Sequence, residues 1–229
     1  MTTLLEQLLS LATAGTMMIS SALTTSAPQN DIDGLLFLQN RQWRVSAAYI
    51  PEVRETEIPG KVRNLWEDAA KALEEMYADC LAETGKKLIS VSGYRSYQTQ
   101  ATIYEHKLKS VNGSKARADE YVARPGASEH QLGMAMDLGV EEKQETSSKF
   151  DQTIAGAWAT ENCWKYGFIL RYQEEWEDIT GYKHEEWHFR YVGTENARKI
   201  YENQMPLESY LILLRQETLM EIVVGGDAQ

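Results

Sequence analysis

Residues 128–137 read Ser-Glu-His-Gln-Leu-Gly-Met-Ala-Met-Asp, and the rest of the chain is organised around them. The second half of this stretch alternates small or acidic residues with apolar ones, which is the period of a β-strand. One face of this predicted strand carries Asp137 with Gly133 and Ala135, and the other face carries apolar side chains. Small residues beside a carboxylate let a metal ion and a ligand come close to the backbone. His130 precedes the strand and supplies an imidazole.

A second stretch, Glu185-Glu186-Trp187-His188, adds another imidazole later in the chain. Residues 186–192 alternate again, which predicts a strand with His188 and Arg190 on one face. We therefore expect this strand to bring its histidine to the same site as the first stretch.

His130, Asp137 and His188 are a complete set of protein ligands for a catalytic zinc ion, which keeps its fourth position for water. Glu185 lies three positions before His188. A carboxylate beside such a site is the usual general base for that water. The residues therefore predict a zinc peptidase.

The other histidines, and the residues near the predicted ligands, are not predicted to bind the metal. Glu186 is predicted to be solvated, and His106 to lie on a helix surface. His184 is not predicted as a fourth ligand, because neighbours on a strand point to opposite faces. Three aromatic residues are assigned to the core rather than to a sugar-stacking surface: Trp187, Phe189 and Tyr191.

Arg95 follows Ser92-Gly93-Tyr94 at the end of a predicted strand, where loops often carry function. One interpretation is an ordinary surface arginine. The other is a guanidinium that grips a substrate or its developing oxyanion, for which a planar cationic fork is suited.

The rest of the chain predicts an α+β fold, with helices packed on a small, mainly antiparallel sheet. Apolar spacing indicates the elements, together with the predicted capping residues Ser96, Ser114, Thr194 and Gly85, and residues 173–183 are a predicted polar loop. The predicted helices are 60–84, 97–110, a short one from 114, 150–164, 194–201 and 207–215. The predicted strands are 87–92, 133–138, 168–172 and 186–192, and residues 35–40 are an edge strand or a packed lead-in segment.

The net charge of −11 and the sequence pI of about 4.9 argue against a nucleic-acid surface. Cys80 and Cys163 both fall in predicted helices, as two buried thiols or as a single disulfide. Neither has a second cysteine at ligand spacing, which argues against a cysteine zinc site.

Residues 1–34 are predicted to be an N-terminal leader or arm, and residues 35–229 the catalytic domain. The leader has a small-residue tract like the end of a signal peptide, but Arg41 is the first basic residue. A degenerate export signal, an amphipathic arm and a disordered leader remain alternatives. Glu6 argues against a stable membrane span.

Three motifs together resemble the D-alanyl-D-alanine carboxypeptidases of the vancomycin-resistance type, within the lysostaphin/D-Ala-D-Ala peptidase/hedgehog zinc superfamily. They are Ser92-Gly93-Tyr94-Arg95-Ser96, Ser128-x-His130-x-x-Gly133-x-Ala135-x-Asp137 and Glu185-x-Trp187-His188-x-Arg190-Tyr191. Residues 166–172 and 178–182 also resemble the family's approach to its last ligand. The resemblance spans about residues 35–210 and implies the hedgehog/D,D-peptidase-like zinc fold.

The resemblance implies a role for each matching residue. His130, Asp137 and His188 would hold Zn²⁺, and Glu185 would be the base. Arg95 would bind the substrate and steady the oxyanion, and Ser128 would bind substrate near the metal. Many relatives have proline in place of Glu186 and an aromatic residue in place of His184, which puts the substrate preference in doubt rather than catalysis.

The implied activity is removal of the terminal D-alanine from a peptidoglycan stem peptide or its precursor. An L,D-carboxypeptidase acting on tetrapeptide stems, a D-Ala-D-Ala dipeptidase and a non-catalytic zinc-bearing binding module are alternatives. The substrate implies a place in the bacterial cell envelope, with the cytoplasm as the alternative. The sequence does not determine the oligomeric state.

Overall fold

The computed structural model describes residues 34–141 and 145–225. The described residues divide into two compact units, one within residues 38–207 and one of residues 34–37 and 208–225. The alternatives for residues 1–33 lie outside the described residues. The predicted boundary between a leader and a catalytic domain therefore stays a prediction.

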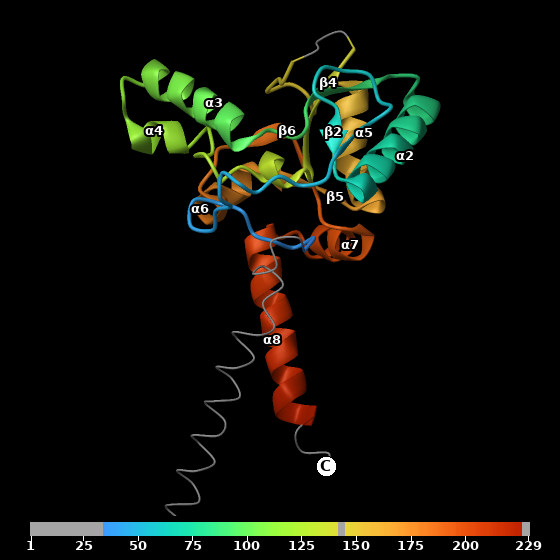
Figure 1. Cartoon of the computed structure of the whole chain (residues 1–229). Helices are drawn as coiled ribbons and strands as arrows, with labels where there is room; N and C mark the ends of the chain where they lie inside the picture. Colours follow the sequence, from blue (N-terminus) through green and yellow to red (C-terminus); the bar gives the residue numbers. More distant parts are fainter. Residues whose placement is uncertain (1–33, 142–144, 226–229) are drawn as a thin grey trace, which may run out of the picture. The chain divides into compact units, whose positions relative to one another are not determined.

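The larger unit is built on an antiparallel sheet, which confirms the α+β prediction (Figure 1). Its strands in spatial order are β3 (Leu88–Ser92), β4 (Ala135–Val140), β6 (Glu185–Tyr191) and β5 (Phe168–Tyr172). A smaller antiparallel pair joins β1 (Arg54–Glu55) to β2 (Asn64–Leu65). All four strands of the main sheet overlap the predicted strands, of which β4 and β6 were predicted from alternation.

The helices of this unit occupy most of the predicted segments. They are α2 (Glu67–Thr84), α3 (Tyr97–Ser110), α4 (Lys115–Asp119), α5 (Ile154–Asn162), α6 (Glu177–Thr180) and α7 (Thr194–Asn203). Short 3-10 turns are η2 (Glu129–Leu132), η3 (Cys163–Tyr166) and η4 (Glu174–Trp176). The other unit contains α8 (Leu207–Gly225), which begins one residue before the division between the units.

Helices α2 and α5 cover one face of the main sheet (Figure 1). Leu73 and Met76 of α2 are fully buried in one apolar cluster with Leu138 of β4 and Phe189 of β6. The period of a strand sends the intervening residues to the opposite face. That opposite face carries the polar residues of the candidate site. The sheet thus separates the apolar core from the candidate site.

The predicted helix from residue 60 begins only at Glu67, because the residues before it pair as strand. Gly60 approaches the backbone of β3 so closely that a Cβ there would lie 2.0 Å from the Ser90 carbonyl oxygen. At the other end, Gly85 has φ 68° and caps α2 as predicted.

Other predicted boundaries are corrected as well. Phe150 lies before α5, which begins after the Thr153 cap, and Thr194 is the first residue of α7 rather than its cap. The predicted loop 173–183 contains η4 and α6, and α8 continues past Arg215. Residues 35–40 contain a turn and no strand, and the burial of Leu36, Phe37 and Gln39 favours the alternative of a packed lead-in segment.

Cys80 and Cys163 are free and buried in the core of the larger unit, so the interpretation as two buried thiols is confirmed. Burial raises the pKa of the Cys163 thiol to about 12. Both sulfurs are therefore packing groups rather than reactive ones.

Candidate metal centre

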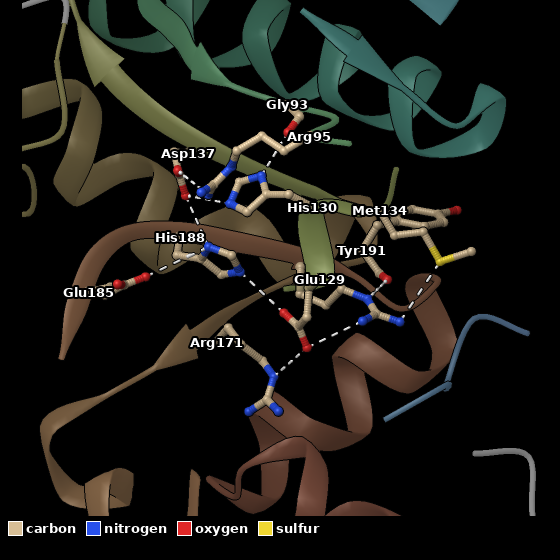
Figure 2. Close-up of polar contacts among 11 residues, drawn as sticks. Gly93, Arg95, Glu129, His130, Met134, Asp137, Arg171, Glu185, His188 and Tyr191 are labelled. Atoms are coloured by element: carbon tan, nitrogen blue, oxygen red, sulfur yellow. Dashed lines mark hydrogen bonds and ion pairs between the residues drawn. The ribbon is translucent and has the colours of Figure 1, made fainter. Parts of the chain in front are cut away.

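His130, Asp137 and His188 meet on the polar face of the sheet. Asp137 Oδ1 lies 3.2 Å from His130 Nε2 and 3.0 Å from His188 Nδ1 (Figure 2). One possible ligand atom from each residue falls within 4.8 Å of the others, and all three residues are buried. Residues far apart in the sequence thus form one cluster.

The strands explain two of these three positions. Asp137 of β4 and His188 of β6 are direct cross-strand partners, so their side chains leave the sheet side by side. His130 comes from η2, which ends at Gly133 with φ 72°. A Cβ on Gly133 would lie 2.7 Å from Val53 Cγ1, so this position requires glycine.

The donor set fits a zinc ion. Tetrahedral bonds of about 2.0–2.2 Å place ligand atoms about 3.4 Å from one another, close to the separations around Asp137 Oδ1. Among the described residues, the buried His130 Nε2 has no hydrogen-bond partner. A buried nitrogen that lies beside a carboxylate oxygen and makes no hydrogen bond is typical of a metal ligand.

Both imidazoles are anchored through their other nitrogen. His130 Nδ1 lies 2.7 Å from the carbonyl oxygen of Gly93, and His188 Nε2 lies 3.2 Å from Glu129 Oε2. A hydrogen bond behind the ring holds the orientation and tautomer of a metal-binding histidine. The second nitrogen of each ring, His130 Nε2 or His188 Nδ1, is therefore directed at Asp137.

Charge and burial act differently on the three groups. Burial lowers the pKa of His130 to about 4, helped by the charge of Arg95. Burial works against ionised Asp137, but the two histidines outweigh it and hold its pKa well below the usual range. For His188, burial is outweighed by hydrogen bonds to Asp137 and Glu129, which raise the pKa to about 9.

Glu185 lies beside this cluster, with Oε2 3.8 Å from His188 Nδ1 (Figure 2). Simple alternation along a strand would put residues three apart on opposite faces. The pairing of β5 with β6 is irregular between the Leu170 and Tyr172 partners, and such a bulge redirects side chains. Burial raises the pKa of Glu185 to about 7, near the working pH of a general base.

Two of the residues adjacent to Glu185 and His188 differ from their predictions. Glu186 is buried, so the prediction that it is solvated is wrong. His184 lies outside the cluster, and its Nδ1 is 2.8 Å from the carbonyl oxygen of Tyr172. Trp187 lines the cleft at the site rather than the core, whereas Phe189 is in the core.

Arg95 is held at the edge of the cluster, with Nη2 3.3 Å from Asp137 Oδ2. Its Nη1 donates to Gln100 Oε1 at 3.0 Å, and Gln100 in turn donates to the backbone of Ala123. The guanidinium is thus oriented rather than loose on the surface. Ser128 is buried and lines the same cleft as Arg95 and Glu185.

Sequence reasoning missed a buried ion cluster behind His188. Glu129 Oε1 accepts from Arg171 Nε at 2.9 Å and lies 3.2 Å from Arg190 Nη1. Burial would raise the pKa of Glu129, but the two arginines and His188 hold it well below its usual range. The available signal was the place of Arg190 and His188 on one strand face, which predicts a shared acidic partner.

Across residues 34–141 and 145–225, no helix is both long and apolar enough to span a membrane.

The comparisons with known proteins cover the candidate site and most of the chain. The sequence model of the VanY family, described as D-alanyl-D-alanine carboxypeptidase, matches residues 62–194. The matched segment includes every residue of the cluster and the two neighbours Arg95 and Glu185.

Two curated relatives extend the match beyond that segment. The protein YodJ of Bacillus subtilis (strain 168) is 40% identical over 196 residues, covering 82% of this chain and 69% of YodJ. A D-alanyl-D-alanine carboxypeptidase of Enterococcus faecalis (strain ATCC 700802 / V583) is 33% identical over 199 residues, covering 83% and 71%.

Two solved structures share the fold. The LdcB LD-carboxypeptidase is 38% identical with a TM-score of 0.71, covering 80% of this chain and 86% of that one. The vancomycin resistance D,D-pentapeptidase VanY, an E175A mutant in complex with Zn(II), is 34% identical with a TM-score of 0.66, covering 77% and 98%. With the family match over residues 62–194, the chain belongs to the VanY family of D-alanyl-D-alanine carboxypeptidases.

Proposed function

We propose that this protein is a zinc D-Ala-D-Ala carboxypeptidase that removes the C-terminal D-alanine from peptidoglycan stem peptides. The observation that carries the proposal is the buried cluster of His130, Asp137 and His188 with Glu185 beside it. The family membership and the Zn(II) complex of the VanY neighbour support the same activity.

In this proposal His130, Asp137 and His188 hold the zinc ion. The ion supplies a Lewis acid that polarises the scissile carbonyl group and lowers the pKa of a water molecule. Glu185 accepts a proton from the attacking water and returns it to the leaving amine of D-alanine. Its raised pKa allows one carboxylate to do both.

Arg95 and Ser128 are proposed to handle the substrate. The oriented guanidinium of Arg95 lies next to Asp137, where it can stabilise the negative charge that develops on the carbonyl oxygen. Ser128 lines the cleft and can hydrogen-bond the peptide close to the scissile bond. Because the protein carries a net charge of −11, a local cation is needed to hold an anionic peptide terminus.

We propose that the protein works at the bacterial cell envelope, because its stem-peptide substrate is found there. The similarity to the LdcB LD-carboxypeptidase keeps one second candidate in view, hydrolysis of a tetrapeptide stem by the same site. The two activities differ in the residue that precedes the scissile bond, not in the chemistry.

The first test is mass spectrometry of zinc-loaded protein incubated with matched tetra- and pentapeptide stems. Loss of one alanine from the pentapeptide alone is the expected result. Loss from the tetrapeptide alone would instead assign the L,D activity. Cleavage of neither peptide by protein with bound zinc would contradict the proposal and favour a binding module.

The second test uses Glu185→Gln, with Glu186→Gln as its control on the same strand. The first change should lower kcat about 10²–10⁴-fold while zinc content stays stoichiometric, because only the proton acceptor is lost. The second should keep the parent's turnover. Equal turnover by Glu185→Gln and the parent would refute the assigned base, and stoichiometric zinc in His130→Ala would refute the assigned ligand.

A further inference from the structure

The ring of His188 lies between two carboxylates. Its Nδ1 is 3.0 Å from Asp137 Oδ1, and its Nε2 is 3.2 Å from Glu129 Oε2 (Figure 2). Only one ring nitrogen can offer a lone pair to a metal ion, and the other then keeps its hydrogen. The partner of that hydrogen decides which nitrogen is offered.

Glu129 is a costly partner to place there. Its side chain is fully buried, and so are Arg171 and Arg190, which contact its other oxygen. Taking such charges out of water costs several kcal/mol per ion, and a buried ion pair is often no more stable than a well-packed apolar group. Stability alone therefore does not account for a carboxylate at this position.

The position of Glu129 in the chain links it to the other side of the cluster. Glu129 and His130 are consecutive in η2, so one short turn sends an imidazole to Asp137 and a carboxylate to the far side of His188. Arg190 lies two positions after His188 on β6, on the same face, and Arg171 comes from the neighbouring strand β5. Two strands therefore converge on the carboxylate that η2 supplies.

We infer that Glu129 is the positioning residue for His188: it accepts the Nε2–H hydrogen bond and thereby presents Nδ1 to the metal, while Arg171 and Arg190 hold the carboxylate in place. This inference rests on the proposed zinc site. His130 has only a neutral acceptor, the Gly93 carbonyl oxygen, behind its ring. A carboxylate behind the ring both orients the ligand and makes it more basic.

The decisive variant is Glu129→Gln, which keeps the size of the side chain. Its amide oxygen is expected to turn to the arginines, which leaves an NH₂ group facing His188 and favours the wrong tautomer. Zinc affinity, measured by competition with a chelator, should fall about 10–100-fold. Glu186→Gln is the matched control. Like Glu129, Glu186 is a buried glutamate, but it lies on β6 and is absent from the metal cluster. Parent-like zinc affinity in Glu129→Gln would overturn the inference.

A spectroscopic measurement on the unmodified protein does not depend on any variant folding. In ¹⁵N-histidine NMR of the zinc-loaded protein, His188 should show a slowly exchanging proton on Nε2 and a metal-shifted Nδ1. A metal-shifted Nε2 would overturn the inference. Glu129→Asp, which keeps the charge but shortens the reach, should retain more zinc affinity than Glu129→Gln.

These readouts separate this inference from the proposed function, because none of them uses a substrate. Weakened zinc binding in Glu129→Gln, in a protein that cleaves neither stem peptide, would support the positioning role and contradict the peptidase. Cleavage of the pentapeptide with unchanged zinc affinity in Glu129→Gln would do the reverse.

Discussion

Two clusters of arginine and glutamate in the larger unit use the same chemistry in opposite surroundings. One joins Glu129 to Arg171 and Arg190, with all three side chains at most 1% exposed. The other joins Arg54 to Glu67 and Glu74, with side chains 25–49% exposed. We call them the buried cluster and the surface cluster.

The hydrogen bonds of the two clusters have similar lengths. Arg54 Nη1 donates to Glu74 Oε1 at 2.7 Å, and Arg171 Nε donates to Glu129 Oε1 at 2.9 Å. The clusters differ in whether water can replace a charged side chain that loses its partner. Water replaces a lost partner in the surface cluster, whereas a buried charge is left unpaired. Burial, not bond length, decides how much each cluster matters.

The largest effect is expected from Glu129→Ala, which leaves two buried guanidinium groups without their carboxylate. The free energy of unfolding should fall by about 3–5 kcal/mol. Urea denaturation of the metal-free protein measures this without a contribution from bound zinc. A loss below about 1 kcal/mol would show that water reaches the buried cluster and would erase the contrast.

Arg171→Met should cost less, because Arg190 and His188 still contact the Glu129 carboxylate. Removing one charged hydrogen bond at constant packing should lower the free energy of unfolding by about 1.5–3 kcal/mol. The same urea titration applies. A cost equal to that of Glu129→Ala would mean that the cluster acts as one indivisible unit.

The surface cluster should show weak coupling. In a double-mutant cycle of Arg54→Ala and Glu74→Ala, the coupling energy should be about 0.2–1 kcal/mol, and it should shrink at high salt. Thermal or urea unfolding of the four proteins gives the value. A coupling of about 3 kcal/mol or more, insensitive to salt, would place Arg54 and Glu74 in the energetic class of the buried cluster.

The smallest effect is the pH dependence of Glu74. The hydrogen bond from Arg54 lowers its pKa below the ordinary value of 4.5, although burial opposes the shift. A lowered pKa contributes stability above pH 4.5, and that contribution is lost as the pH falls through the folded value. The parent should therefore exceed Glu74→Gln in stability at pH 7, and the two should converge at acidic pH. An unchanged difference at both pH values would contradict an ionised Glu74 as its source.

Much of the fold could be predicted because local signals and final structure agree. Alternation places β4 and β6, and the capping residues Ser96 and Gly85 mark helix ends that the structure retains. The candidate ligands His130, Asp137 and His188 could be named because few residue types bind zinc and their pattern is distinctive.

Two local patterns are overridden by pairing between distant segments. The β5–β6 irregularity turns Glu185 toward His188, against simple alternation. Likewise, the pairing of β1 with β2 takes over residues that have helical spacing. In each case long-range pairing outweighs the local period, which a sequence pattern does not contain.

Periodicity and capping residues are local properties, so the amino-acid pattern predicts where most strands and helices lie and which residue types are available for the chemistry. Which polar groups are buried together depends on the three-dimensional fold. Glu129 looks like any acid in an acidic chain until Arg171 and Arg190 close around it. The energy of a charge–charge interaction depends on how far the charges are removed from water. That removal depends on which segments, far apart in the sequence, pack around them.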